Sequence, residues 1–142
     1  MAEILLGSHV GMSGKEMFLG SVKEAESYGA NVLMVYTGAP QNTRRKEIGE
    51  LRIDEGISYA EKAGIREIVI HAPYIINLGN MEKPEMFDFG VEFLAKEVKR
   101  AAAFHSKVLV LHPGSSLSAG VEASVEQIAK GLNLVLSLIH IS

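Results

Sequence analysis

Residues 68–78 read IVIHAPYIINL, and both the fold and the candidate site can be worked out from this stretch. A short run of apolar, β-branched residues ends in His71, which is followed by a proline and a tyrosine. Residues 108–115 repeat the pattern as VLVLHPGS, with His112 after an apolar run. Uninterrupted apolar runs of this length are typical of buried parallel strands. The two stretches therefore predict two buried strands, each bringing a histidine to its carboxyl end.

The rest of the chain alternates in the same way. Residues 4–6 and 31–36 are further apolar runs, and an amphipathic or capped segment follows each of the four runs. The predicted strands are residues 4–6, 31–36, 67–71 and 107–112, and the predicted helices are 13–28, 42 or 43 to 64, 84 to about 106, and 121 to about 136. Strands that alternate with helices favour a parallel α/β sheet covered by helices. An open doubly wound sheet and part of a (β/α)₈ barrel both fit this order; a full barrel takes roughly 250 residues, so four βα units make an open half barrel.

Composition limits the classes of protein. The chain has 142 residues, with 47% apolar and 22% charged residues, as expected for a soluble globular domain. A net charge of −3 argues against a generally basic nucleic-acid binder, although local basic loops remain possible. Without cysteine there is no disulfide framework and no thiolate metal site. The amino-terminal residues do not resemble a signal peptide, and no apolar run reaches the ~18 residues of a membrane span. We expect a cytoplasmic protein that does not enter a membrane.

The paired histidines suggest a metal site. Sequential parallel strands are usually neighbours about 4.8 Å apart, which would put His71 and His112 on one rim. Imidazole is a preferred zinc ligand, but a catalytic zinc needs a third protein ligand, and no Asp or Glu ends a predicted strand. His9 ends the first predicted strand and could support the ligands, face a substrate, or be a core histidine. The alternative for His71 and His112 is a strand-end histidine bonded to a backbone carbonyl.

Two loops on the same rim suit nucleic acid. Arg44, Arg45 and Lys46 form the one basic cluster. Cations at a predicted helix start oppose the helix dipole, so their presence there indicates a role other than stabilising the helix. Tyr74 and Ile75 follow His71 and could stack on bases or wedge between them. Solvated basic residues and ordinary core packing are the alternatives.

The loop after the fourth predicted strand is rich in small residues. Gly114 and Ser115 could offer free backbone N–H groups to an anion such as a phosphate, or could simply form a turn.

Four ordered motifs together resemble the endonuclease IV family of apurinic/apyrimidinic endonucleases. They are GSHV at 7–10, YTGAPQNTRR at 36–45, HAPYIINLG at 71–79 and LHPGS at 111–115. The resemblance runs without gaps from residue 1 to about 136.

The resemblance implies a TIM barrel with a trinuclear zinc site that cleaves double-stranded DNA on the 5′ side of an abasic sugar, acting as a monomer. It implies that His71 and His112 are zinc ligands, and that Arg44 or Arg45, Tyr74 and Ile75 enter the DNA. His9 matches a rim position.

The resemblance also implies ligands that this chain lacks. The family continues with a strand ending in a bridging glutamate and then with further Asp and His ligands. Residues 137–142 (SLIHIS) have no family counterpart. We therefore expect residues 1–136 to be the N-terminal half of such a barrel in a truncated reading frame, with weak zinc binding and no nuclease activity. The alternatives are a metal-dependent sugar isomerase or epimerase on a similar barrel, and a fragment that is no enzyme.

Overall fold

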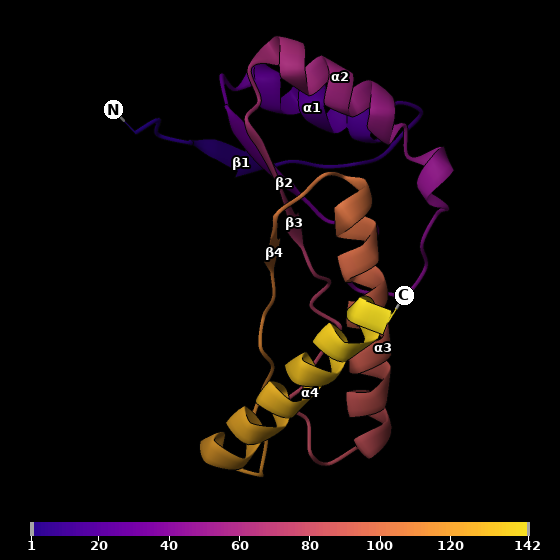
Figure 1. The fold of residues 1–142 in the computed structure, drawn as a ribbon, viewed down its shortest axis with the longest axis vertical. Coiled ribbons are helices and arrows are strands. Elements are labelled where there is room, and N and C mark those ends of the chain that lie inside the picture. Colours follow the sequence, from indigo (N-terminus) through magenta and orange to yellow (C-terminus); the bar gives the residue numbers. More distant parts are fainter. Residues whose placement is uncertain (1, 142) are drawn as a thin grey trace.

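The computed structural model describes residues 2–141, with side chains through residue 139. Strands and helices alternate along the chain (Figure 1). The elements in order are β1 (Gly7–His9), α1 (Phe18–Ser27), β2 (Val32–Val35), the 3₁₀ helix η1 (Ile48–Glu50), α2 (Ile53–Ala63), β3 (Glu67–His71), α3 (Pro84–Ala103), β4 (Val108–Val110) and α4 (Val121–Ile141). The predicted succession of four βα units is confirmed.

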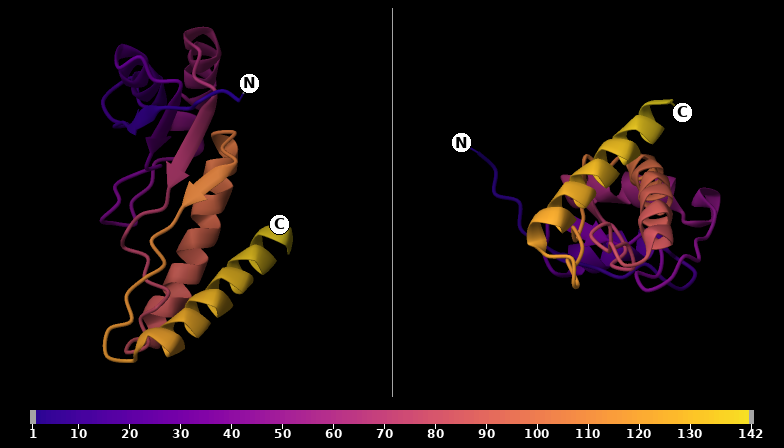
Figure 2. Two further views of the ribbon diagram at one scale, coloured as in Figure 1. Left: turned by 90° about the vertical axis from the view of Figure 1, so that its left-hand side faces the viewer. Right: turned by 90° about the horizontal axis from the view of Figure 1, so that it is seen from below.

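The four strands form one parallel sheet in the order β1-β2-β3-β4. Within the described residues, β1 and β4 each pair on one side only, so the sheet is open at both edges. The helix α4 packs against α3 and crosses it obliquely (Figure 2). All four carboxyl ends of the strands point to one edge, because the strands are parallel.

One face of the sheet is covered by helices and the other is not. Leu33 and Ile70 on the covered face are buried. On the opposite face of β4, Val108 and Val110 remain 49% and 37% exposed. Val108 pairs in register with Val69, and Val110 with His71, so His71 lies on this uncovered face. In a closed barrel the same face would line the interior.

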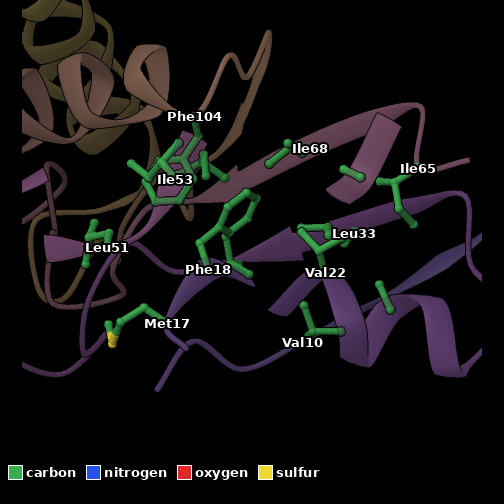
Figure 3. Close-up of a cluster of buried hydrophobic side chains, with 14 of the residues drawn as sticks. Val10, Met17, Phe18, Val22, Leu33, Leu51, Ile53, Ile65, Ile68 and Phe104 are labelled. Atoms are coloured by element: carbon green, nitrogen blue, oxygen red, sulfur yellow. The ribbon is translucent and has the colours of Figure 1, made fainter. Parts of the chain in front are cut away.

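The larger core cluster is built around Phe18 of α1 (Figure 3). The Phe18 ring meets the Phe104 ring edge to face, with centroids 4.9 Å apart. Gly56 lies inside α2 against Phe18, and a Cβ there would lie 2.4 Å from Phe18 Cδ2. A glycine in a helix interior is therefore explained here by close packing.

The first strand lies later than predicted. Residues 4–6 are exposed, and the strand is Gly7–His9. Asn31 accounts for the shift. Its amide donates to the Leu6 carbonyl at 3.1 Å, but before that residue its side chain takes over, accepting from the Leu6 amide at 2.7 Å and donating to the Ile4 carbonyl at 2.9 Å. The regular strand pairing therefore begins at Gly7.

The first helix also begins later than predicted, at Phe18 rather than after Ser13. Ser13 instead forms an isolated bridge with Met17, which has a positive φ of 49°. The segment is thus a tight turn. Tyr28, at the end of the predicted helix, is exposed.

The second helix begins at Ile53, not at Asn42 or Thr43. The Asn42 side chain accepts from the Arg44 amide at 2.9 Å, which closes a local turn instead of capping a helix. The predicted stop is correct, because Gly64 ends α2 with a left-handed φ of 80°.

The remaining boundaries are close to the predictions. The strand β3 matches residues 67–71, and Pro84 is the first residue of α3. The strand β4 ends at Val110, so His112 lies two residues beyond it. The helix α4 continues past Leu136 through the predicted tail to Ile141, while Ser142 lies outside the described residues. Among the described helices, none combines the length and apolarity needed to cross a membrane.

Candidate metal and nucleic-acid site

Four aromatic rings line the carboxyl ends of the four strands on the uncovered face. His9 ends β1, Tyr36 follows β2, His71 ends β3 and His112 follows β4. Ring centroids lie 4.7 Å apart for His9 and Tyr36, 4.9 Å for Tyr36 and His71, and 5.0 Å for His71 and His112. The sheet therefore delivers one ring per strand to a single row.

His71 is the buried member of this row, with 7% of its surface exposed. Its Nδ1 lies 2.6 Å from the carbonyl oxygen of Ala72, and the Ala72 amide in turn donates to the Val110 carbonyl at 2.8 Å. A neutral imidazole that donates through Nδ1–H keeps its lone pair on Nε2. This backbone contact is typical of metal-binding histidines, whose second ring nitrogen is usually held by a carbonyl or carboxylate.

His112 is exposed and lies next to His71. Two neighbouring imidazoles with their rings 5.0 Å apart fit two ligands of a metal site, since each ring nitrogen binds zinc at roughly 2.0–2.1 Å. Within the part of the chain that the structure describes, no group of three or more His, Asp or Glu side chains is arranged to hold an ion. The pair fits part of a metal site and lacks a third donor.

His9 lies at the far end of the row, with its ring centroid 6.1 Å from that of His71. Partial burial lowers the pKa of His9 below 6.5, and the positive charge of protonated His71 lowers it further. Tyr36 between the two histidines was not predicted as a site residue; its position one residue after an apolar strand was the available signal.

In the loop after β2, the two adjacent arginines, which the sequence does not distinguish, have different surroundings. The Arg45 side chain is 10% exposed and its Nε donates to Glu97 Oε1 at 2.8 Å. Arg44 is exposed. Arg44, Arg45 and Lys46 all line a cavity of about 520 Å³ that also borders Tyr36. Arg44 and Lys46 are the exposed members of this basic cluster.

Tyr74 and Ile75 differ in their surroundings. Tyr74 is 55% exposed on the loop that follows His71. Ile75 is half-buried against the smaller core cluster, which joins this loop to α3 and α4. The structure thus leaves an aromatic ring free at the rim and anchors the residue beside it.

The loop after β4 is tied to the loop after β3 by Asn77. The Asn77 side-chain oxygen accepts from the Ser115 amide at 2.9 Å and from the Gly79 amide at 3.0 Å. Gly114 has a φ of 127°, and a Cβ there would lie 2.4 Å from Asn77 Oδ1. The Ser115 amide already has a partner, so Gly114 and Ser115 form a bridge between loops at the rim.

Comparisons with known proteins agree with this architecture. The family model described as xylose isomerase-like TIM barrel matches residues 22–140. The probable endonuclease 4 of Lachnoclostridium phytofermentans is 61% identical over 132 residues, which cover 93% of this chain and 44% of that protein. The chain thus spans less than half the length of this relative.

Solved structures share the fold. Endonuclease IV from Thermus thermophilus matches with a TM-score of 0.78 and 26% identity, covering 96% of this chain and 48% of that one. A D-tagatose 3-epimerase-like protein matches with a TM-score of 0.64 at 19% identity, covering 95% of this chain and 49% of that one, a likeness of fold alone. The predicted fold class, a partial and open parallel α/β barrel, is confirmed. The chain belongs to the xylose isomerase-like TIM barrel family, within which it matches endonuclease IV over somewhat less than half of that protein's length.

Proposed function

We propose that this chain carries part of the active site of a zinc-dependent endonuclease that cleaves double-stranded DNA on the 5′ side of abasic sites. The observation that carries the proposal is the His71–His112 pair at the carboxyl ends of adjacent strands, with His71 Nδ1 held by the Ala72 carbonyl. The similarity to proteins named probable endonuclease 4 supports the same reaction class.

His71 and His112 would hold metal, with His71 offering Nε2. A bound divalent ion supplies an activated water and stabilises negative charge on a phosphoryl group. The contribution of the protein would be to hold His71 Nδ1 at the Ala72 carbonyl, which leaves Nε2 for the ion. Partial burial lowers the pKa of His9 and so disfavours a positive charge beside that ion.

For the DNA interface we propose Arg44, Lys46 and Tyr74, with Ile75 supporting Tyr74. The burial of Arg45 against Glu97 favours Arg44 as the arginine that meets a phosphate. The ring of Tyr74 is exposed three residues after His71, the proposed metal ligand. Such a ring suits stacking against the bases that flank a missing base, because little unstacking energy is needed to enter the gap. A small sugar substrate would need neither group, which favours the nuclease over an isomerase or epimerase.

We further propose that residues 1–136 form the N-terminal half of the barrel and that residues 137–142 differ from the endonuclease IV sequence pattern, while the broader xylose isomerase-like TIM barrel model matches through residue 140. The complete protein would be a cytoplasmic monomer that acts on abasic DNA. The match to 44% of a relative's length supports the half barrel.

Zinc titration tests the histidine pair. Competition with a chromophoric chelator should show weak zinc binding by the native chain. The zinc affinity should fall at least tenfold in His71→Ala and in His112→Ala, because each change removes one imidazole from a two-imidazole site. His105→Asn is the matched control, because His105 is exposed at the end of α3 with a φ of 57° that Asn tolerates.

Equal zinc affinity in all four proteins would contradict the ligand assignment. The substrate class is tested separately with a fluorescent duplex that contains one tetrahydrofuran abasic analogue. The chain should bind it more tightly than the intact duplex, and equal affinity for both would contradict abasic DNA as the substrate.

A further inference from the structure

The loop after β2 is held by a buried polar cluster on α3 that the proposed metal site does not use. Phe93, Glu97 and Arg100 lie at helical spacing on one face of α3. The Glu97 side chain is 1% exposed, and burying a carboxylate is costly unless it is fully paired.

Glu97 is paired on both oxygens. Oε1 accepts from Arg45 Nε at 2.8 Å, and Oε2 accepts from the Thr37 hydroxyl at 2.7 Å. Both partners belong to the loop after β2, so this carboxylate joins α3 to the beginning and to the far side of that loop.

Arg45 in turn binds the backbone of the loop. Its Nη1 donates to the carbonyls of Ala39 and Asn42, each at 3.1 Å, and of Arg44 at 2.7 Å. The guanidinium lies over the Phe93 ring, 5.0 Å from the centroid. Nη2 is buried and has no hydrogen-bond acceptor among the described residues. The cation–π contact with the Phe93 ring compensates for this missing hydrogen bond.

Two further contacts fix the ends of the loop. Arg100 Nη2 donates to the Thr37 carbonyl at 2.8 Å, and Nη1 donates to the Lys46 carbonyl at 2.9 Å. Gly38 lies directly on the Arg45 stem, where a Cβ would be 2.6 Å from Arg45 Cδ. The loop from Thr37 to Lys46 is thus wrapped around one arginine and clamped at both ends.

Arg44 is exposed on this otherwise fixed loop, and its carbonyl is one of those bound by Arg45. We propose that Glu97 is a positioning residue, which acts through Arg45 to hold Arg44 in place for a DNA phosphate. This inference rests on the proposed DNA-binding function for its ligand, but its structural part, the ordering of the loop, stands apart from that function.

A double-mutant cycle with Glu97→Gln and Arg44→Ala tests the positioning role. Gln keeps the size of Glu97 but removes the charge that pairs with Arg45. In the native background, Arg44→Ala should weaken binding of the tetrahydrofuran duplex roughly tenfold, measured by fluorescence anisotropy at low salt. In the Glu97→Gln background the same change should cost about twofold or less, because Arg44 is no longer held in place.

A merely structural role for Glu97 would leave the effect of Arg44→Ala unchanged, and that result would overturn the proposal. Glu92→Gln is the matched control, because Glu92 is exposed on the same helix; the full cost of Arg44→Ala should persist in that background.

Amide hydrogen exchange followed by mass spectrometry separates this proposal from the proposed function. Exchange over residues 38–46 should rise roughly tenfold in Glu97→Gln, while exchange in α1 stays at the native rate. Unchanged exchange in the loop, or an equal rise in α1 from general destabilisation, would overturn the positioning role. If the native chain binds the tetrahydrofuran duplex and the intact duplex equally, the proposed function fails. The exchange measurement still shows in that case whether Glu97 orders the loop.

Discussion

At the scale of single residues, tight packing and local hydrogen bonds decide positions that the sequence leaves ambiguous. Arg44 and Arg45 are adjacent and chemically alike, yet Arg44 is exposed and Arg45 forms an ion pair with Glu97. Gly56 reads as a defect in a helix, yet it is the contact surface for Phe18. Neither distinction can be made without knowing which residues from distant elements lie opposite.

Gly56→Ala tests the packing explanation. The added methyl would lie 2.4 Å from Phe18 Cδ2, so the α1–α2 contact must open. Overpacking costs typically about 1–3 kcal/mol, while the gain in helix propensity offsets up to roughly 1 kcal/mol. We expect a net loss of about 1–2 kcal/mol in the free energy of unfolding, measured with urea.

Gly49→Ala is the control for this change. Its Cβ would meet no atom within 4 Å, and Gly49 has no positive φ, so stability should be unchanged or slightly higher. A Gly56→Ala protein as stable as the native chain would show that α1 and α2 adjust at no cost.

At the scale of elements, the loops at the carboxyl ends of the strands are structured by their side chains. Asn42 and Arg45 shape the loop after β2, which the sequence suggested was the start of a helix. Asn77 links the loops after β3 and β4, and so joins the segments that carry His71 and His112.

Asn77→Ala should loosen this link. It removes the acceptor of the partly buried Gly79 amide and of the exposed Ser115 amide, which water can solvate, so we expect a loss of about 1 kcal/mol in the free energy of unfolding. Asn77→Asp should retain most of the stability at neutral pH, since a carboxylate accepts the same two bonds. Equal losses in both variants, measured by urea unfolding, would show that the amide nitrogen matters more than the oxygen.

At the scale of the whole molecule, the sheet is open and one of its faces is uncovered. Val108 and Val110 are exposed on that face, beside the row of rings. Exposed apolar surface next to free strand edges favours association. The proposed metal site is likewise incomplete, because among the described residues no group of three or more His, Asp or Glu side chains is arranged to hold an ion.

We therefore expect no cleavage of an abasic duplex by the 142-residue chain with added zinc. Gel electrophoresis of a labelled strand provides the measurement, with a complete endonuclease IV as positive control. Robust turnover that His71→Ala abolishes would show that these residues make a sufficient site without further ligands.

Local patterns in the sequence were enough to predict the alternation of strands and helices, the bounds of β3, the proline start of α3 and the glycine stop of α2. These features depend on periodicity and backbone preference, which act within a few residues. The same patterns marked His71 and His112 as neighbours, because parallel strands bring their carboxyl ends to one edge.

Contacts in the folded chain were needed to establish where β1, α1 and α2 begin. At β1 the deciding contacts come from Asn31, 25 residues along the chain from Leu6. At α1 and α2 the turns at Met17 and Asn42 replace the predicted helix starts, and the capping patterns do not reveal them. The separate places of Arg44 and Arg45 also come from the tertiary structure, because the partner that buries Arg45 is a carboxylate 52 residues away on α3.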